Sequence, residues 1–153
     1  MRYIKKILPM AKNDILELER LEKMCFSSPW TSSALLEELE NPQAHFLVCR
    51  VGNTIVGYIG VQEICGEAYI TSICVLPEFR RQGIADTLLC HAQEGAKGRG
   101  CVFITLEVRK SNNQAIKLYE KNSYSIMGER KNFYSSPMEN ALIMTKYFNT
   151  ELL

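Results

Sequence analysis

Hydrophobic residues recur in this chain with the two periods that distinguish helices from strands. In residues 14–24, Ile15, Leu18 and Leu21 share one helical face, and their spacing predicts an amphipathic helix. Further helices are predicted over residues 34–39 and 84–97, and in a segment that opens with a capping-box pattern at residues 111–114. Strands are predicted over residues 2–8, 45–50, 54–63, 68–76, 101–108, 123–130 and 141–148.

The order of these elements predicts an α/β fold with a mixed sheet. A hairpin signal at Gly52-Asn53 and a turn at Cys65-Gly66-Glu67 indicate antiparallel neighbours in the first half of the chain. The helix over residues 84–97 crosses between two strands, which favours a parallel pair. We therefore predict about seven strands flanked by about four helices. Since no repeat or linker interrupts the pattern, residues 1–153 are expected to form a single domain.

The charge balance narrows the range of partners. Among 153 residues, 18 are basic and 17 are acidic, so no general field attracts nucleic acid or an anionic membrane, and neither is expected as a partner. Residues 1–14 mix charged and apolar side chains and never reach the length of a signal segment or a membrane span. We therefore expect a cytoplasmic protein that holds any charged ligand locally.

The six cysteines are interpreted as structural. They show no C-x-x-C spacing and lie mostly in apolar runs, which predicts buried reduced thiols in preference to zinc ligands or disulfides. A catalytic cysteine is not expected either, because neither His45 nor His91 has a setting that identifies it as an imidazole partner. No metal is predicted.

A candidate anion site follows the strand over residues 68–76. The segment Arg80-Arg81-Gln82-Gly83-Ile84-Ala85 leads from a turn directly into a helix. Backbone N–H groups at a helix start lack intrahelical partners, and small residues let an anion approach them. This pattern predicts a pyrophosphate cradle with two arginines at its rim. A small-residue turn before a helix, with solvated arginines, is the structural alternative.

The segment from Arg80 to Ala85 resembles the acetyl-CoA signature of the GCN5-related N-acetyltransferases, Q/R-x-x-G-x-G/A. Residues 111–119, Ser-Asn-Asn-Gln-Ala-Ile-Lys-Leu-Tyr, are similar to the family's second pattern, S-N-x-x-A-x-x-L-Y. The segments Leu-Glu-Val-Arg at 106–109 and Ser-Pro-Trp at 28–30 resemble the RimI-type subfamily, which acetylates the N-terminal alanine of a small-subunit ribosomal protein. One departure is Ser123, which lies where relatives often have glycine and is expected to affect a turn.

The resemblance implies acetyl-CoA as cosubstrate and assigns residues to it. Backbone groups of Ile73, Cys74 and Val75 are expected to pair with the pantetheine arm as an added strand does. The pyrophosphate is assigned to Arg80, Arg81, Gln82, Gly83, Ile84 and Ala85. Asn112 is expected to support the helix start, to bind the cofactor, or to do both.

Two residues are candidates for the chemistry of direct acetyl transfer. Glu107 alternates with Leu106 and Val108 on its strand and is predicted to take a proton from the acceptor amine, directly or through water. A solvated strand-end carboxylate is the alternative. Tyr119 is predicted to protonate the departing thiolate, and a core tyrosine is the alternative. Both catalytic assignments rest on the family resemblance.

The resemblance implies that the acceptor is a protein N-terminus. Within that class, it implies the N-terminal alanine of a small-subunit ribosomal protein. An α-amine titrates near 8 and a lysine near 10.4, so the α-amine is more easily deprotonated. Trp30 and Tyr134 are candidate acceptor contacts, although either residue could serve packing. The alternatives are a small-molecule amine such as a polyamine, an amino sugar or an antibiotic, and a non-catalytic acyl-CoA-binding module.

Overall fold

The computed structural model describes residues 4–148 and contains a seven-stranded sheet in the order β1-β2-β3-β4-β5-β7-β6. The strands are β1 (Lys5–Pro9), β2 (Ala44–Val51), β3 (Thr54–Ile64), β4 (Glu67–Val75), β5 (Phe103–Arg109), β6 (Ser125–Ser135) and β7 (Met138–Tyr147). The α-helices are α1 (Ile15–Cys25), α2 (Ser32–Glu40), α3 (Ile84–Gly98) and α4 (Asn113–Lys121). The predicted mixed α/β sheet and the order of its elements are confirmed.

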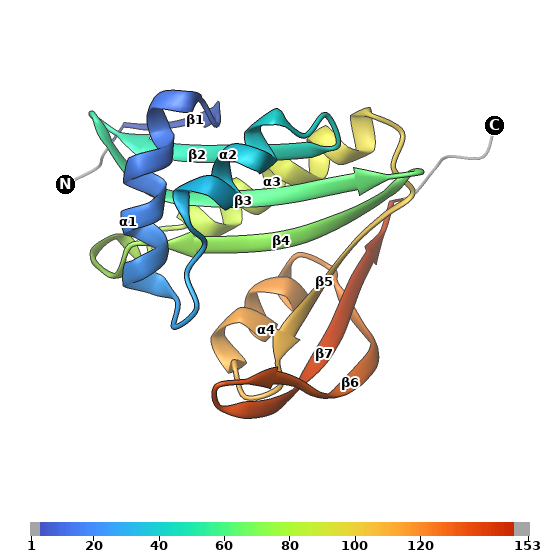
Figure 1. Ribbon diagram of the computed structural model, residues 1–153. Helices are drawn as coiled ribbons and strands as arrows, with labels where there is room; N and C mark the ends of the chain where they lie inside the picture. The colour runs from blue at the N-terminus through green and yellow to red at the C-terminus, as the bar shows by residue number, and fades with distance from the viewer. Residues whose placement is uncertain (1–3, 149–153) are drawn as a thin grey trace.

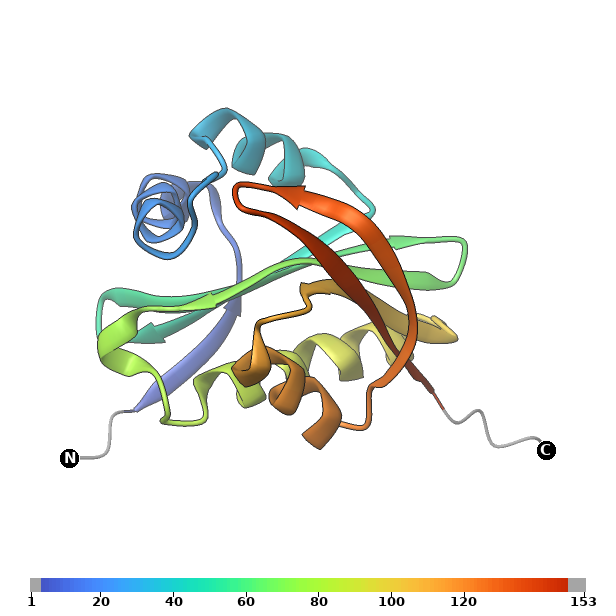
Figure 2. The ribbon, with the colours of Figure 1, turned by 90° about the horizontal axis from the view of Figure 1, so that it is seen from below.

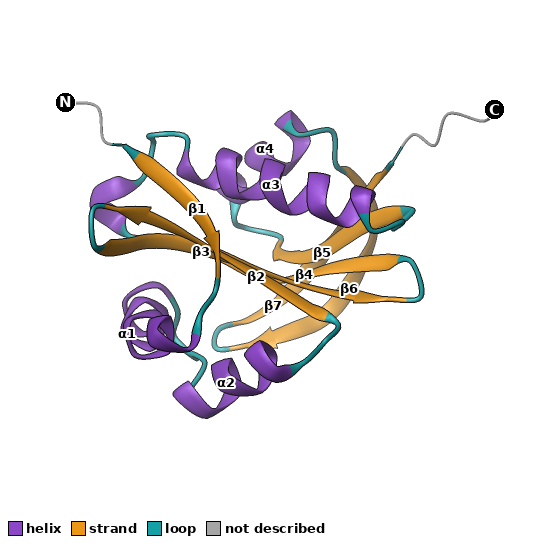
Figure 3. Cartoon of the chain, turned by 90° about the horizontal axis from the view of Figure 1, so that it is seen from above, coloured by secondary structure: helices purple, strands orange, loops and turns teal. Residues whose placement is uncertain are grey.

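The helices cover both faces of the sheet, α1 and α2 on one side and α3 and α4 on the other (Figure 3). The apolar stripe predicted for the first helix faces inward, because Leu18 and Leu21 are buried. In α3, Leu88 and Leu89 also face the sheet and are fully buried. Burying each such leucine contributes about 2 kcal/mol, which fixes the helices on the sheet and thereby positions their ends.

The sheet opens between its two central strands. The parallel pairing of β4 with β5 joins only Glu67, Ala68 and Tyr69 to Phe103, Ile104 and Thr105. Beyond this point the strands diverge, and β5, β6, β7 and α4 form a separate lobe below β4 (Figure 1). The crossover helix α3 enforces the parallel direction, as predicted. The divergence leaves the carboxyl end of β4 free on one side, where ligands collect in such sheets.

Several predicted boundaries require correction. The first strand covers Lys5–Pro9 and not residues 2–8, of which residues 2 and 3 lie outside the described part of the chain. The segment 131–140 was expected to link two strands, but β6 continues to Ser135 and β7 starts at Met138. Its polar residues form a paired hairpin because both faces of this edge strand are largely exposed.

The capping box predicted at Ser111 is also wrong. Asn112 is the N-cap of α4, and its Oδ1 accepts a hydrogen bond from the Ala115 N–H at 3.2 Å. An asparagine caps as well as a serine, and the Ser111 N–H instead donates to Glu139 at 2.7 Å. The helix therefore starts one residue later, and Ser111, just before the cap, joins the start of the helix to β7.

The cysteine prediction is confirmed only in part. Cys49, Cys74 and Cys101 are buried, whereas Cys65 and Cys90 are exposed and Cys25 is half-buried. The apolar runs around the exposed pair belong to a turn and to the outer face of α3. All six are free thiols.

The part of the chain from residue 4 to residue 148 has no helix that is long and apolar enough to cross a membrane.

Candidate active site

A cavity of about 840 Å³ lies at the carboxyl end of β4 and brings the predicted cofactor residues together. Those that line it are Ile73, Val75, Arg80, Arg81, Gly83, Ile84, Ala85 and Asn112, with Tyr119 among them. Cys74 and Gln82 do not line it; the Cys74 side chain points to the opposite face of β4 and is buried. The predicted contribution of Cys74 is a backbone one and remains a prediction.

The start of α3 has the features of an anion cradle. Gly83 is its N-cap, has φ +78° and ψ 10°, and leaves the helix without a side-chain cap. No heavy atom would lie within 4 Å of a Cβ placed on Gly83, so the space above it is open. Uncapped N–H groups and the positive end of the helix dipole face this space. A diphosphate therefore fits the residues present here.

The two arginines beside the cradle differ in their contacts. The Arg80 Nε donates to the Val75 carbonyl oxygen at 3.0 Å, so Arg80 braces the end of β4. Arg81 is exposed and has a left-handed φ of 62°. Lys117, from α4, lines the same cavity and supplies a cation that sequence analysis did not single out. The sequence could have pointed to Lys117, because this residue lies two positions before Tyr119 on the same helix.

Replacing Gly83 tests the cradle. In Gly83→Ala the left-handed backbone costs about 1–2 kcal/mol, and the added Cβ enters the space above the helix start. We expect the KM for acetyl-CoA to rise about tenfold, measured from initial rates, because about 1.4 kcal/mol corresponds to a factor of ten.

The matched control is Gly98→Ala at the other end of α3. The space around Gly98 is open and its φ is not left-handed, so this change should leave the KM unaltered and stability unchanged or about 0.5–1 kcal/mol higher. An unaltered KM in Gly83→Ala would contradict the assignment of the cradle.

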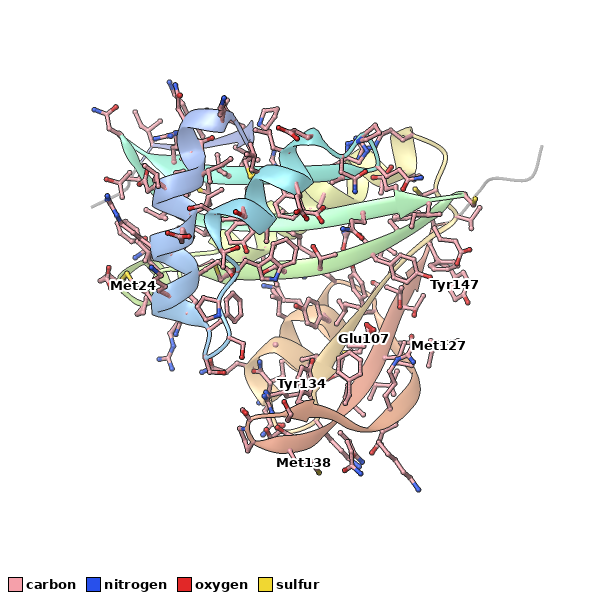
Figure 4. The ribbon with its side chains drawn as sticks, in the orientation of Figure 1. Met24, Glu107, Met127, Tyr134, Met138 and Tyr147 are labelled. Carbon is pink, nitrogen blue, oxygen red and sulfur yellow. The ribbon has the colours of Figure 1, made fainter. Side chains whose placement is uncertain are left out.

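Glu107 lies on β5 with its neighbours facing the core, as predicted. Leu106 and Val108 are buried, whereas the Glu107 side chain is 29% exposed and its carboxylate lies 3.8 Å from the Arg130 Nε. Glu107 comes from β5 and Tyr134 from β6, which belong to the same lobe (Figure 4). Burial, followed by the negative charge of Glu107, raises the pKa of Tyr134. Glu107 lines neither this cavity nor the second one beside it, so its role as the base that takes a proton from the acceptor remains a prediction.

Tyr119 lies across the cavity from β4, on α4. Its side chain is 4% exposed, and its ring packs against that of Tyr124 with centroids 5.6 Å apart. Burial raises the pKa of the Tyr119 phenol, so the hydroxyl keeps its proton throughout the neutral range. Tyr119 therefore packs in the core and also lines the cavity, and its role as a proton donor remains a prediction.

A second cavity, of about 320 Å³, adjoins the first and contains both predicted acceptor residues. Trp30 lies in the loop after α1 and Tyr134 near the end of β6, and Phe26 lines both cavities. The β6–β7 hairpin reaches across the sheet toward the loop between α1 and α2 (Figure 2). Trp30 also packs against Phe46, with ring centroids 5.9 Å apart, so its packing role is observed while its contact with an acceptor remains a prediction.

Glu22 at the base of this second cavity was missed by sequence analysis. It is 1% exposed and accepts hydrogen bonds from the Trp30 N–H at 2.8 Å and from the Tyr58 hydroxyl. Burial and the Glu22 charge raise the pKa of Tyr58, which therefore remains a donor. The sequence does contain an indication of a buried carboxylate, because Glu22 lies four residues after Leu18 on the apolar face of α1.

Arg109 fixes the other wall of the second cavity. Its guanidinium lies 4.3 Å from the centroid of the Tyr134 ring and donates to the Pro137 carbonyl oxygen at 2.9 Å. It also pairs with Glu139 at 3.2 Å. These contacts hold the hairpin tip, and with it Tyr134, against β5.

Thr71 lies where β4 bulges opposite Gly60 and Val61. Its hydroxyl oxygen is buried, has no hydrogen-bond partner within residues 4–148, and belongs to a residue that lines the second cavity. A buried hydroxyl without a partner is costly. The hydroxyl would have to rotate out of the packing to contact a molecule in this cavity.

Comparison with known proteins decides the family. The sequence model described as "Acetyltransferase (GNAT) family" matches residues 15–124. The chain belongs to this family. It is an acetyl-CoA-dependent N-acetyltransferase, and the predicted fold and resemblance are both confirmed.

Individual relatives share nearly the whole chain. A Bacillus subtilis protein provisionally named a ribosomal protein bS18-alanine N-acetyltransferase is 40% identical over 88% of this chain and 90% of its own. The Haemophilus ducreyi ribosomal protein bS18-alanine N-acetyltransferase is 32% identical over 90% of this chain and 97% of its own. The RimI-type resemblance is therefore confirmed at the level of sequence.

Solved structures agree with this assignment. The ribosomal-protein-S18-alanine N-acetyltransferase from Escherichia coli superposes with a TM-score of 0.88 at 25% identity, over 98% of this chain and 99% of its own. Arabidopsis thaliana NAA60, solved with acetyl-CoA, also gives a TM-score of 0.88, over 96% of this chain and 100% of its own, at 16% identity. The second likeness concerns the fold alone.

Proposed function

We propose that this protein transfers an acetyl group from acetyl-CoA to the N-terminal α-amine of a protein, and that its acceptor is the N-terminal alanine of ribosomal protein bS18. Relatives that match over about nine-tenths of the chain carry that activity in their names. The structure adds support from the second cavity, which takes the acceptor in this proposal.

The charge of the second cavity carries the argument for a peptide. The one carboxylate among its lining residues, Glu22, is 1% exposed and is already hydrogen-bonded to Trp30 and Tyr58. Arg109 adds a positive charge to the same lining. A polyamine carries several ammonium groups and an amino sugar at least one, and these groups need accessible carboxylates, which this lining does not provide. Aromatic rings and hydroxyls suit an extended peptide.

The proposed reaction assigns one task to each of two side chains. Glu107 accepts a proton from the acceptor ammonium, so that the amine lone pair can attack the thioester carbonyl. Tyr119 donates its phenolic proton to the sulfur that departs. Transfer is direct in a ternary complex, and the start of α3 with Arg81 and Lys117 binds the pyrophosphate end of the cosubstrate.

A turnover panel tests the choice of acceptor. Acceptors are a peptide with the N-terminal sequence of bS18, the same peptide with its α-amine blocked, and the polyamine spermidine, each with acetyl-CoA. We expect kcat/KM for the free peptide to exceed that for spermidine at least a hundredfold, and the blocked peptide to be inert. Preference for spermidine would overturn the proposal, and absence of turnover with every acceptor would favour a binding module.

A further inference from the structure

Cys25 and Cys74 form a thiol pair where α1 meets β4. Cys25 is the last residue of α1 and is half-buried, while Cys74 lies on β4 and is buried. The two thiols interact, since each is the largest cause of the shift in the other's pKa. Cys25 also lines the cofactor cavity, and its sulfur lies 3.8 Å from the Val75 carbonyl oxygen.

A positive charge accompanies this pair. The Arg80 Nη2 lies 3.9 Å from the Cys25 sulfur, and the same guanidinium is held in place through its Nε by the Val75 carbonyl oxygen at 3.0 Å. A thiol that combines partial exposure with a fixed cation is the type of cysteine that reacts. If the Cys25 sulfur is oxidised, the Cys74 thiol beside it can react with it to form a disulfide within the same molecule.

We propose that Cys25 and Cys74 are an oxidant-sensitive dithiol, in which a hydroperoxide oxidises Cys25 and Cys74 then closes a disulfide. In the first step the Cys25 thiolate attacks one peroxide oxygen, the O–O bond breaks, and Cys25 sulfenic acid and an alkoxide or hydroxide form. In the second step the Cys74 sulfur attacks the Cys25 sulfur and water leaves. The two thiols lose two electrons, and the peroxide bond gains them.

The charges around the pair favour this order of events. The interaction with the Cys74 side chain lowers the pKa of Cys25 to about 7, burial opposes this shift, and Arg80 adds a smaller lowering. The interaction with Cys25, followed by burial, raises the pKa of Cys74. Cys25 therefore loses its proton before Cys74 does and is the more reactive thiol of the pair.

The chain offers internal controls for the test. Cys65 and Cys90 are more exposed than Cys25 and lie outside both cavities. The full-length reduced protein is treated with hydrogen peroxide at pH 7, remaining thiols are alkylated, and peptides are identified by mass spectrometry. We expect a peptide pair linked through Cys25 and Cys74, about 2 Da lighter than its reduced components, to appear several-fold faster than oxidation at Cys65 or Cys90.

Two variants separate the steps. In Cys74→Ser, Cys25 should stop at the sulfenic acid, which dimedone traps. In Cys25→Ser, Cys74 should remain a thiol while Cys65 and Cys90 react as before. Absence of the linked peptide from the wild-type chain, or oxidation of Cys25 no faster than that of Cys65 and Cys90, would overturn the proposal.

Acetyl-CoA provides a further test, because Cys25 lines the cavity assigned to it. Saturating acetyl-CoA should slow formation of the disulfide at least fivefold. This protection rests on the placement of the cosubstrate, whereas the oxidation does not. A disulfide that forms equally fast with acetyl-CoA present would therefore count against that placement and leave the dithiol supported.

Discussion

Glu107→Gln should lower kcat by about 10²–10⁴, the usual contribution of a general base. Glutamine keeps the size of the side chain but cannot accept the proton of the acceptor ammonium. The lost ion pair with Arg130, at 3.8 Å and partly exposed, contributes less than about 1 kcal/mol, so the fold should be unaffected. Steady-state rates with a bS18 peptide measure the effect, and calorimetry measures the Kd for acetyl-CoA, which should change less than about twofold.

Glu120→Gln is the matched control for this first variant. Glu120 is an exposed carboxylate on α4, next to Tyr119 in sequence. Neither glutamate lines a cavity, but only the charge of Glu107 acts on Tyr134, which lines the second one. The rate of Glu120→Gln should equal that of the unaltered protein. A Glu107→Gln enzyme that retains full kcat would remove the carboxylate from the mechanism, while a matching loss in Glu120→Gln would attribute the effect to general surface charge.

Tyr119→Phe should lower kcat by about 10²–10³, because it removes the proton donor for the departing thiolate. The ring keeps its contact with Tyr124 at a centroid distance of 5.6 Å, so stability should change by less than about 1 kcal/mol. Since burial raises the pKa of Tyr119, the unaltered enzyme should show no loss of rate from its ionisation as the pH approaches 10, where an ordinary tyrosine begins to lose its proton.

Tyr124→Phe is a close control, because Tyr124 is buried beside Tyr119 and the substitution likewise removes a single hydroxyl. Within the described part of the chain the Tyr124 hydroxyl has no hydrogen-bond partner. Its removal should leave kcat unaltered and stability unchanged or higher. Equal losses of kcat in the two variants would show that packing, and not the proton of Tyr119, matters.

The topology could be predicted because it depends on local pattern and on general rules of chain connection. The alternation in residues 45–63 and the turn between them specify a hairpin, and a helix between two strands imposes their parallel pairing. Ser123 lies where relatives often have glycine, and its φ of 72° is left-handed, as a position that favours glycine implies. The hairpin and the turn at Ser123 are decided within a few residues, whereas the parallel pairing follows from a general rule of chain connection.

The hairpin tip and the second cavity depend on contacts that pattern does not reveal. Residues 131–135 look like a loop because β6 is an edge strand with polar residues on both faces. Its pairing is stabilised by Arg109, which is distant in sequence and reaches Pro137 and Glu139. Glu22 was hidden for the same reason, since its partners Trp30 and Tyr58 lie on other elements.

The cofactor residues were easier to predict than the acceptor residues. Gly83 and its neighbours form one continuous segment, and the physical demands of a diphosphate are the same in any protein that binds one there. Trp30 and Tyr134, by contrast, belong to separate segments, and only the folded chain places them in one cavity. The family resemblance implied both acetyl-CoA and the acceptor, but only the folded chain shows the cavity that is proposed to hold the acceptor.

The position of the acetyl group on a peptide tests the central claim most directly. The acceptor is a bS18 peptide that carries a free N-terminal alanine and an internal lysine, and tandem mass spectrometry locates the added group after reaction with acetyl-CoA. We predict a single acetyl group on the alanine α-amine. Acetylation of the lysine, or an unmodified peptide after prolonged reaction, would contradict the account.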